Sequence, residues 1–141
     1  MAHMTVSAER HPSEWSMVVP DAREALRARV AVRHFLAEQA DACSDLDAVE
    51  TIVGELVANV IQYAPGAMGI HVAWDGPTAT LVISDRGPGI PIVRPVPTAE
   101  NTSGRGLFLI QALALAMQID SAPGYGTRVL VELPVRRRRC A

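Results

Sequence analysis

The stretch TATLVISDRGPGIP, residues 78–91, places an acidic residue directly after a run of β-branched and aliphatic side chains. Residues 78–83 have the composition of a strand. The loop that follows Asp85 combines glycine, which permits unusual backbone angles, with proline, which restricts φ; its members are Gly87, Pro88, Gly89 and Pro91. Polar side chains at the end of a strand are held rigidly by that strand. Asp85 is therefore a candidate site residue.

The segment before this strand has the same period of two. In MGIHVAW, residues 68–74, the apolar side chains Ile70, Val72 and Trp74 fall on one face. Leu81 and Ile83 alternate in the same way in residues 78–84. The sequence DGP between the two segments is a turn signal, so residues 68–84 are predicted to form an antiparallel hairpin.

Two helices are predicted before the hairpin. Residues 20–40, PDAREALRARVAVRHFLAEQA, begin with Asp21 as the predicted N-cap, and Glu24 follows three residues later as in a capping box. Residues 43–66, CSDLDAVETIVGELVANVIQYAPG, begin with Ser44 as the predicted cap. Apolar side chains recur every three or four positions in this second helix, whereas Glu55 and Asn59 lie off that stripe and project side by side.

The remaining elements are predicted from residue 104 onward. We predict a third helix over residues 104–117, GRGLFLIQALALAM. Because this helix is apolar nearly all round, we expect it to pack on a sheet. We predict two strands joined by a glycine turn over residues 117–135, MQIDSAPGYGTRVLVELPV. We therefore predict an α+β fold: a two-layer sandwich of a mixed, mostly antiparallel sheet with helices on one face.

Length and composition limit the possible functions. The chain has 141 residues, a formal net charge of -2, and 49% hydrophobic and 20% charged residues, which fits one folded domain. Neither cysteine, Cys43 or Cys140, belongs to a C-x-x-C motif, and the sequence shows no signal peptide or membrane helix, so we expect a cytoplasmic protein. Residues 1–19 are assigned to an expression scar and flexible leader, 20–134 to the domain and 135–141 to a basic tail.

Three special stretches fall at element ends: Glu55 with Asn59, Asp85 with its glycines, and Gly104 with Gly106 at the start of the third helix. A helix N-terminus preceded by glycines offers unpaired N–H groups to phosphate. The Asn59 amide oxygen suits Mg²⁺, which takes one or two protein oxygens beside phosphate and water. Glu55, one helical turn away, is placed to orient or deprotonate an attacking hydroxyl or water. Each signal alone is weak, and neither a P-loop nor a G-x-G-x-x-G after a strand is present.

The order of these stretches resembles the Bergerat-fold ATPases, the GHKL superfamily of gyrase, chaperone, histidine kinase and mismatch-repair ATPases. Four segments carry the resemblance across residues 20–134: ELVANVIQYA (55–64), SDRGPGI (84–90), GRGLFLIQALA (104–114) and GYGTRVLVELP (124–134). The short chain and its direct GRGLFLI helix entry look most like the anti-sigma-factor serine/threonine kinases.

The resemblance implies ATP and Mg²⁺ as cofactors and assigns roles to residues. Asp85 would accept a hydrogen bond from the adenine amino group, assisted by Thr127, and Asn59 would be the magnesium ligand. Glu55 would be the catalytic base for the acceptor hydroxyl. The other nucleotide-binding positions are Gly87, Gly89 and Ile90 beside the base and Gly104, Arg105, Gly106 and Leu107 at the phosphates. Residues 91–102 would be the ATP lid. The sequence departs from the superfamily at two positions. Gln62 stands where many members carry a basic residue or glutamate, and Tyr63 stands where a histidine is frequent.

The resemblance implies an ATP-dependent kinase that binds a sigma factor and phosphorylates a serine or threonine of an anti-sigma-factor antagonist, and it implies a homodimer. A module that senses nucleotide and sequesters a partner without phosphotransfer is the alternative. The catalytic part of a histidine kinase is disfavoured, because no dimerisation helices precede Asp21 in this sequence.

The arginine run 136–139 raises the possibility of nucleic-acid binding. No recognition helix or aromatic platform accompanies it, so we expect a solvated, disordered tail and no direct nucleic-acid contact. The four histidines have no metal-ligand spacing, and no transition-metal site is predicted.

Overall fold

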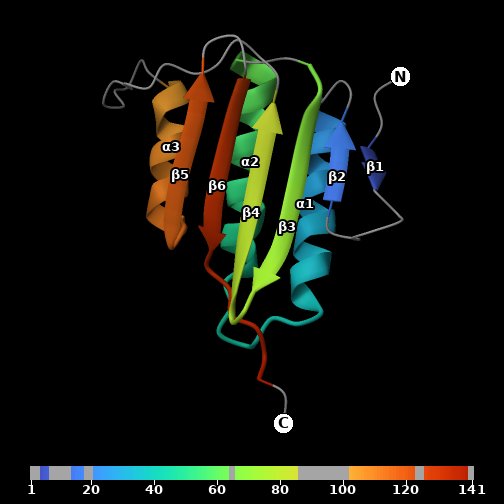
Figure 1. Cartoon of the computed structure of the whole chain (residues 1–141), viewed down its shortest axis with the longest axis vertical. Coiled ribbons are helices and arrows are strands. Elements are labelled where there is room, and N and C mark those ends of the chain that lie inside the picture. Colours follow the sequence, from blue (N-terminus) through green and yellow to red (C-terminus); the bar gives the residue numbers. More distant parts are fainter. Residues whose placement is uncertain are drawn as a thin grey trace.

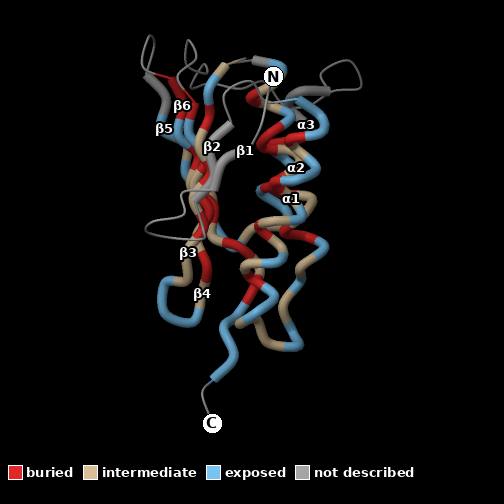
Figure 2. The backbone as a smooth tube through the Cα atoms, turned by 90° about the vertical axis from the view of Figure 1, so that its right-hand side faces the viewer, coloured by how far each residue is buried: buried red, intermediate tan, exposed pale blue. Residues whose placement is uncertain are grey.

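The computed structural model describes residues 4–6, 14–17, 21–63, 66–85, 102–122 and 126–139, with side chains for 21–62, 66–85, 106–120 and 126–139. Strands form one layer and helices α1 (Ala22–Ala37), α2 (Leu46–Tyr63) and α3 (Thr102–Leu113) cover one of its faces (Figure 1). In the side view the buried residues lie where the two layers meet (Figure 2). The predicted α+β sandwich is confirmed.

The described residues form a sheet of six strands in the order β1-β2-β3-β4-β6-β5. Every described pair is antiparallel, so the prediction of a mixed sheet is wrong for this part of the chain, whereas that of a mostly antiparallel one is confirmed. The predicted hairpin is β3 (Met68–Asp75) with β4 (Thr78–Asp85), turning at Gly76 with φ 61°. The two predicted C-terminal strands are β5 (Ala116–Ala122) and β6 (Gly126–Leu133).

Two strands within the assigned leader were not predicted. β1 (Met4–Val6) pairs with β2 (Glu14–Met17), and β2 pairs with β3. The expectation of a flexible leader is therefore wrong for these two segments. A short segment with no strong pattern of its own becomes a strand because the edge of β3 supplies hydrogen-bonding partners.

The helix starts are set by capping side chains. Asp21 accepts a hydrogen bond from the Glu24 backbone N–H at 2.9 Å, as predicted for α1. The α2 cap is Asp45, whose Oδ1 accepts from the Ala48 N–H at 2.9 Å, so the assignment of Ser44 is wrong. The Ser44 hydroxyl instead donates to the Arg136 carbonyl oxygen at 3.2 Å.

The third helix is shorter than predicted. α3 ends at Leu113 and β5 begins at Ala116, so the predicted helical end at Met117 is wrong. The helix is also less enclosed than its composition suggested, because Phe108 is 52% exposed and Leu109 40%. An apolar run suits either a buried helix or a strand, and here the chain switches from one to the other within it.

The core lies between the helices and the sheet. Its largest fully buried apolar side chains come from both layers: Leu36, Ile52, Ile70, Leu81, Ile83, Ile110 and Leu133. The α2 residues predicted to face the core, from Val49 to Val60, are buried, with Leu46 at the helix start only partly so. At the surface, Arg33 of α1 holds α2 through Asp47 and Glu50, at 2.6 Å each. The side-chain hydrogen bond to Asp47, followed by the one to Glu50, raises the pKa of Arg33.

The start of the arginine run is part of the fold. Val135 is 1% exposed, the Arg137 N–H donates to the Pro77 carbonyl, and the Arg138 N–H donates to the Gln39 carbonyl. The expectation of a disordered tail is therefore wrong for residues 135–138, although residues 136–138 are exposed to solvent as expected. Within the described part of the chain, no helix is long and apolar enough to cross a lipid bilayer.

Candidate functional site

Helix α2 presents Glu55 and Asn59 toward α3. The face of α2 that carries Ile52, Leu56 and Val60 is buried in the core, so the helix cannot rotate without exposing it. Glu55 and Asn59 are half-buried beside that face, one turn apart. The packing of this face therefore fixes the side of α2 from which Glu55 and Asn59 project.

Helix α3 approaches this pair of oxygens at Gly106. A Cβ atom placed on Gly106 would lie 2.8 Å from Glu55 Oε2 and 3.7 Å from Asn59 Oδ1. The first distance is shorter than any normal contact, so only a glycine lets the α3 backbone come this close without moving Glu55. Gly106, which is distant in sequence, thus lies beside Glu55 and Asn59 in the structure.

The phosphate-facing stretch predicted at 104–107 lies in the first two turns of α3, which begins at Thr102. The first N–H groups of a helix have no partner within the helix and favour anions. Gly106 is buried, and Leu107, 6% exposed, packs into the core and fixes this end of α3. Gly104 and Arg105 belong to the helix, and the Arg105 side chain lies outside the described residues.

Asp85 and Thr127 form the other half of the predicted site. They are directly opposite each other in the pairing of β4 with β6, and they are 8% and 4% exposed. Because Leu81, Ile83 and Asp85 alternate along β4, the Asp85 side chain points to the same face as the core, toward the helices. The carboxylate thus lies at the end of the apolar layer, beside a threonine.

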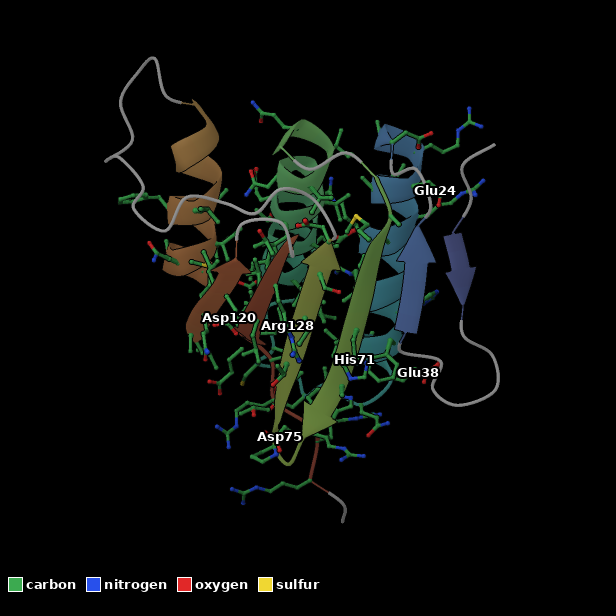
Figure 3. The ribbon with its side chains drawn as sticks, turned by 45° about the horizontal axis from the view of Figure 1, so that its top comes forward. Glu24, Glu38, His71, Asp75, Asp120 and Arg128 are labelled. Carbon is green, nitrogen blue, oxygen red and sulfur yellow. The ribbon has the colours of Figure 1, made fainter. Side chains whose placement is uncertain are left out.

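Both halves lie at one end of the molecule. β4 ends, β6 begins, α2 ends and α3 begins at the top of Figure 1. Figure 3 shows that Arg128 and Asp120, which are paired across β6 and β5, lie on the sheet, and both are exposed, unlike Thr127 beside them. The predicted positions Gly87, Gly89 and Ile90, and the lid 91–102 up to Asn101, lie outside the described residues.

The residues present fit ATP and Mg²⁺. Gly106 leaves a space that a side chain would fill, and the two oxygens around it are a carboxylate and an amide, both hard donors of the kind Mg²⁺ prefers. Asn59 would hold the ion and the amides of α3 would hold phosphate. Among the described residues, no three His, Cys, Asp or Glu side chains gather to hold an ion by themselves.

Sequence reasoning missed one residue near this site, Arg29 of α1. With Gly54 and Glu55 it lines a groove between α1 and α2. The available signal was Gly54, a glycine inside a helix, which costs roughly 1 kcal/mol relative to alanine and usually marks a close approach.

Comparisons with known proteins agree with this geometry. Residues 18–132 match the family described as histidine kinase-like ATPase domain. A protein named anti-sigma F factor, from Clostridium beijerinckii, is 30% identical over an aligned length of 118 residues, covering 74% of this chain and 82% of that protein.

Solved structures show the same fold at lower identity. A mycobacterial sensor histidine kinase, MprB, is 20% identical with a TM-score of 0.52, covering 84% of this chain and 99% of that one. The blue-light activated histidine kinase of Erythrobacter litoralis EL346 is 22% identical with a TM-score of 0.51 over 65% of this chain. The match spans only 32% of that kinase. The family match covers most of the chain and includes both halves of the site, so this protein belongs to the histidine kinase-like ATPase domain family.

Proposed function

We propose that this chain is an ATP-dependent serine/threonine protein kinase that acts as an anti-sigma factor. It would bind a sigma factor and transfer the γ-phosphate of ATP to a serine or threonine of an anti-sigma-factor antagonist. The likeness to a protein named anti-sigma F factor supports the regulatory role. A protein with these partners would work in the cytoplasm, where transcription takes place, and the resemblance to this group favours a homodimer.

The contact between Gly106 and the pair Glu55 and Asn59 carries the proposal. It puts a carboxylate beside the first turns of α3, where phosphate would be held. Phosphoryl transfer depends mainly on positioning and charge stabilisation. A carboxylate at that place is the group that an incoming hydroxyl would meet.

Each residue then has a defined task. Asp85 and Thr127 would bind the adenine, and Asn59 would hold Mg²⁺, which when bound would neutralise charge on the phosphates. Glu55 accepts the proton of the acceptor hydroxyl as its oxygen forms a bond to the γ-phosphorus. The bond from that phosphorus to the bridging oxygen breaks at the same time, and ADP leaves with the electron pair.

Replacement of Glu55 tests this function. Purified protein is incubated with γ-labelled ATP and candidate antagonist proteins. We expect wild type to label a serine or threonine, and Glu55→Gln and Glu55→Ala to lose about 100-fold or more of the rate, since general-base catalysis contributes roughly 10²–10⁴. Affinity for ATP should be unchanged, because Glu55 is not assigned to the nucleotide.

Glu50→Gln is the matched control: it removes a carboxylate from the same helix, where Glu50 pairs with Arg33 at 2.6 Å. Unchanged transfer by both Glu55 variants would contradict the kinase mechanism. Nucleotide-dependent binding of an antagonist with no label on it would favour the alternative, a sequestering module without phosphotransfer.

A further inference from the structure

Asp85 lies between two neighbours in the sheet. Thr127 of β6 is directly opposite it on one side, and Met68, the first residue of β3, is directly opposite it on the other. Directly opposite residues of antiparallel strands point to the same face, and their Cβ atoms lie about 4.5–5.5 Å apart. Met68, Asp85 and Thr127 therefore form one row on the helix-facing side of the sheet, which we call the end row.

The end row lies where β3 and β6 begin and β4 ends, and it is buried. Met68 is 4% exposed, Asp85 8% and Thr127 4%. The next row inward is entirely apolar and consists of Ile70, Ile83 and Val129. The Asp85 carboxylate is thus bordered by a hydroxyl on its β6 side and by a thioether on its β3 side.

The proposed phosphate contact and Met68 lie on opposite sides of Asp85. Helix α3 packs beside β5, at the edge of the sheet beyond β6, whereas β3 lies on the side of α1 (Figure 1). A nucleotide that reaches from α3 to Asp85 would therefore place its phosphates on the β6 side and its base at the end row. Met68 is the next side chain of that row beyond Asp85.

Met68 has suitable chemistry for a contact with a purine ring. A thioether is apolar and polarisable, and its sulfur makes favourable contacts with the edges of aromatic rings. The following inward positions of β3, Ile70 and Val72, carry the β-branched side chains that are common in strands. Methionine is longer and more flexible than either, so at the end of the strand it can adapt to the edge of a base.

The amino group of adenine would bring a second hydrogen close to Met68. One hydrogen is donated to Asp85, and the other then points along the edge of the base toward a neighbour in the end row. Thr127 is assigned to assist the base on the β6 side. A group larger than hydrogen on the amino nitrogen would therefore have to displace Met68 on the β3 side.

We propose that Met68 closes the base end of the nucleotide site and sets the size of the purine that this kinase accepts. The thioether packs against the edge of the base beside its amino group, and no space remains there for a substituent. This inference rests on the proposed function and adds a determinant of its nucleotide specificity.

An enlarged nucleotide tests the role of Met68. N6-propyl-ATP keeps one amino hydrogen for Asp85 and adds a group of about the volume that Met68→Ala removes. Wild type should bind it at least about tenfold more weakly than ATP in calorimetry, because one extra methylene in a filled apolar site costs that much. Met68→Ala should bind the analogue at least as tightly as ATP, which shifts the ratio of the two affinities by about tenfold or more.

Two variants separate this role from a role in stability alone. Met68→Leu keeps the volume of the side chain and should keep the wild-type preference for ATP. Val72→Ala shortens a fully buried side chain of the same strand, further from Asp85. It should lower stability without changing the ratio of the two affinities. A methionine that only packs the core would give the result expected for Val72.

Methionine oxidation gives a second measurement, which needs no variant. Wild type is treated with hydrogen peroxide, with and without Mg²⁺ and a non-hydrolysable ATP analogue, and the sulfoxide at each methionine is quantified by peptide mass spectrometry. The nucleotide should slow the oxidation of Met68 several-fold. Met117 of β5 is the internal control, because its pairing with Val131 places it in a row further from the site.

The proposal is overturned if Met68→Ala keeps the wild-type preference for ATP, or if the nucleotide slows oxidation of Met68 no more than that of Met117. If Met68→Ala does not fold, the oxidation result decides. Wild type that binds no ATP would refute the proposed kinase itself. ATP binding with failure of these tests would remove only the role given to Met68.

Discussion

Asp85 is the residue through which the fold would contact the proposed ligand. A buried carboxylate is costly unless it is hydrogen-bonded, and this one lies at the end of a strand whose preceding inward residues, Leu81 and Ile83, are fully buried. Its neighbour across the sheet is Thr127, which shares the same face. An acceptor held at the boundary of an apolar layer suits a flat base that is itself largely apolar and carries an amino group.

Replacement of Asp85 by asparagine tests the adenine contact. Asparagine keeps the size but removes the charge and one acceptor, so a charge-assisted hydrogen bond worth about 1.5–3 kcal/mol is lost. We expect ATP to bind roughly 10–100-fold more weakly in isothermal titration calorimetry, by the conversion of about 1.4 kcal/mol per tenfold.

Asp75→Asn provides the control for this measurement. Asp75 ends strand β3, is exposed, and lies at the end of the hairpin away from the site (Figure 3). Its replacement should leave the affinity unchanged. Equal affinity in wild type and Asp85→Asn would count against the assignment of Asp85.

At the scale of the elements, two glycines decide how closely the helices approach. Gly54 admits Arg29 of α1 onto α2, and Gly106 admits α3 onto the Glu55 side of α2. Both lie within helices, where glycine is unfavourable on propensity alone. The helical layer thus has close contacts on both flanks of α2, and both involve the surroundings of Glu55.

Gly106→Ala should separate catalysis from stability. The new methyl group would lie 2.8 Å from Glu55 Oε2, so the flexible carboxylate must move. Alanine favours the helix by roughly 0.5–1 kcal/mol over glycine, so we expect no loss of thermal stability. The rate of phosphotransfer should fall by about tenfold or more, as for small misplacements of a catalytic group.

A double-mutant cycle identifies the cause of this loss. If Gly106→Ala acts by moving Glu55, it should have little further effect in a Glu55→Gln background. Full additivity of the two losses would show instead that the methyl group disturbs the nucleotide, and the role given to this contact would fail.

At the scale of the whole molecule, the site lies at one end and the C-terminal segment closes the other. Arg136 and Arg138 hydrogen-bond to the connection between α1 and α2, and Arg137 reaches the β3–β4 turn. The Arg137 guanidinium also lies 6.0 Å from the centre of the Trp74 ring. The segment therefore joins the helical layer to the sheet at the end away from Asp85 and Asn59.

Removal of residues 136–141 should destabilise the protein without changing its function. The loss of several partly exposed hydrogen bonds is expected to lower the free energy of unfolding by about 1–3 kcal/mol, as measured by urea denaturation. ATP affinity should be retained. A chain lacking only Cys140 and Ala141 is the control, and an equal urea midpoint for both chains would mean that the arginine segment does not stabilise the fold.

Much of the fold could be predicted because its strongest patterns are local. A period of two in residues 68–84 indicated the hairpin and which face of it is buried, and a period near 3.6 indicated α2 and placed Glu55 and Asn59 together. The order of the glycine-containing stretches was enough for the family resemblance. These features depend on neighbours within a few residues, so the amino-acid order alone determines them.

Tertiary packing decided the rest. The run from Gly104 to Met117 is mostly apolar, and its division into α3 and β5 depends on the edge of β6, which pairs with residues from Ala116 onward. The short strands β1 and β2 likewise exist because β3 has a free edge. The contact of Gly106 with Glu55, and the meeting of Arg29 with Gly54, join residues far apart in the chain. No local pattern encodes such distances, because they arise only when the helices share one core.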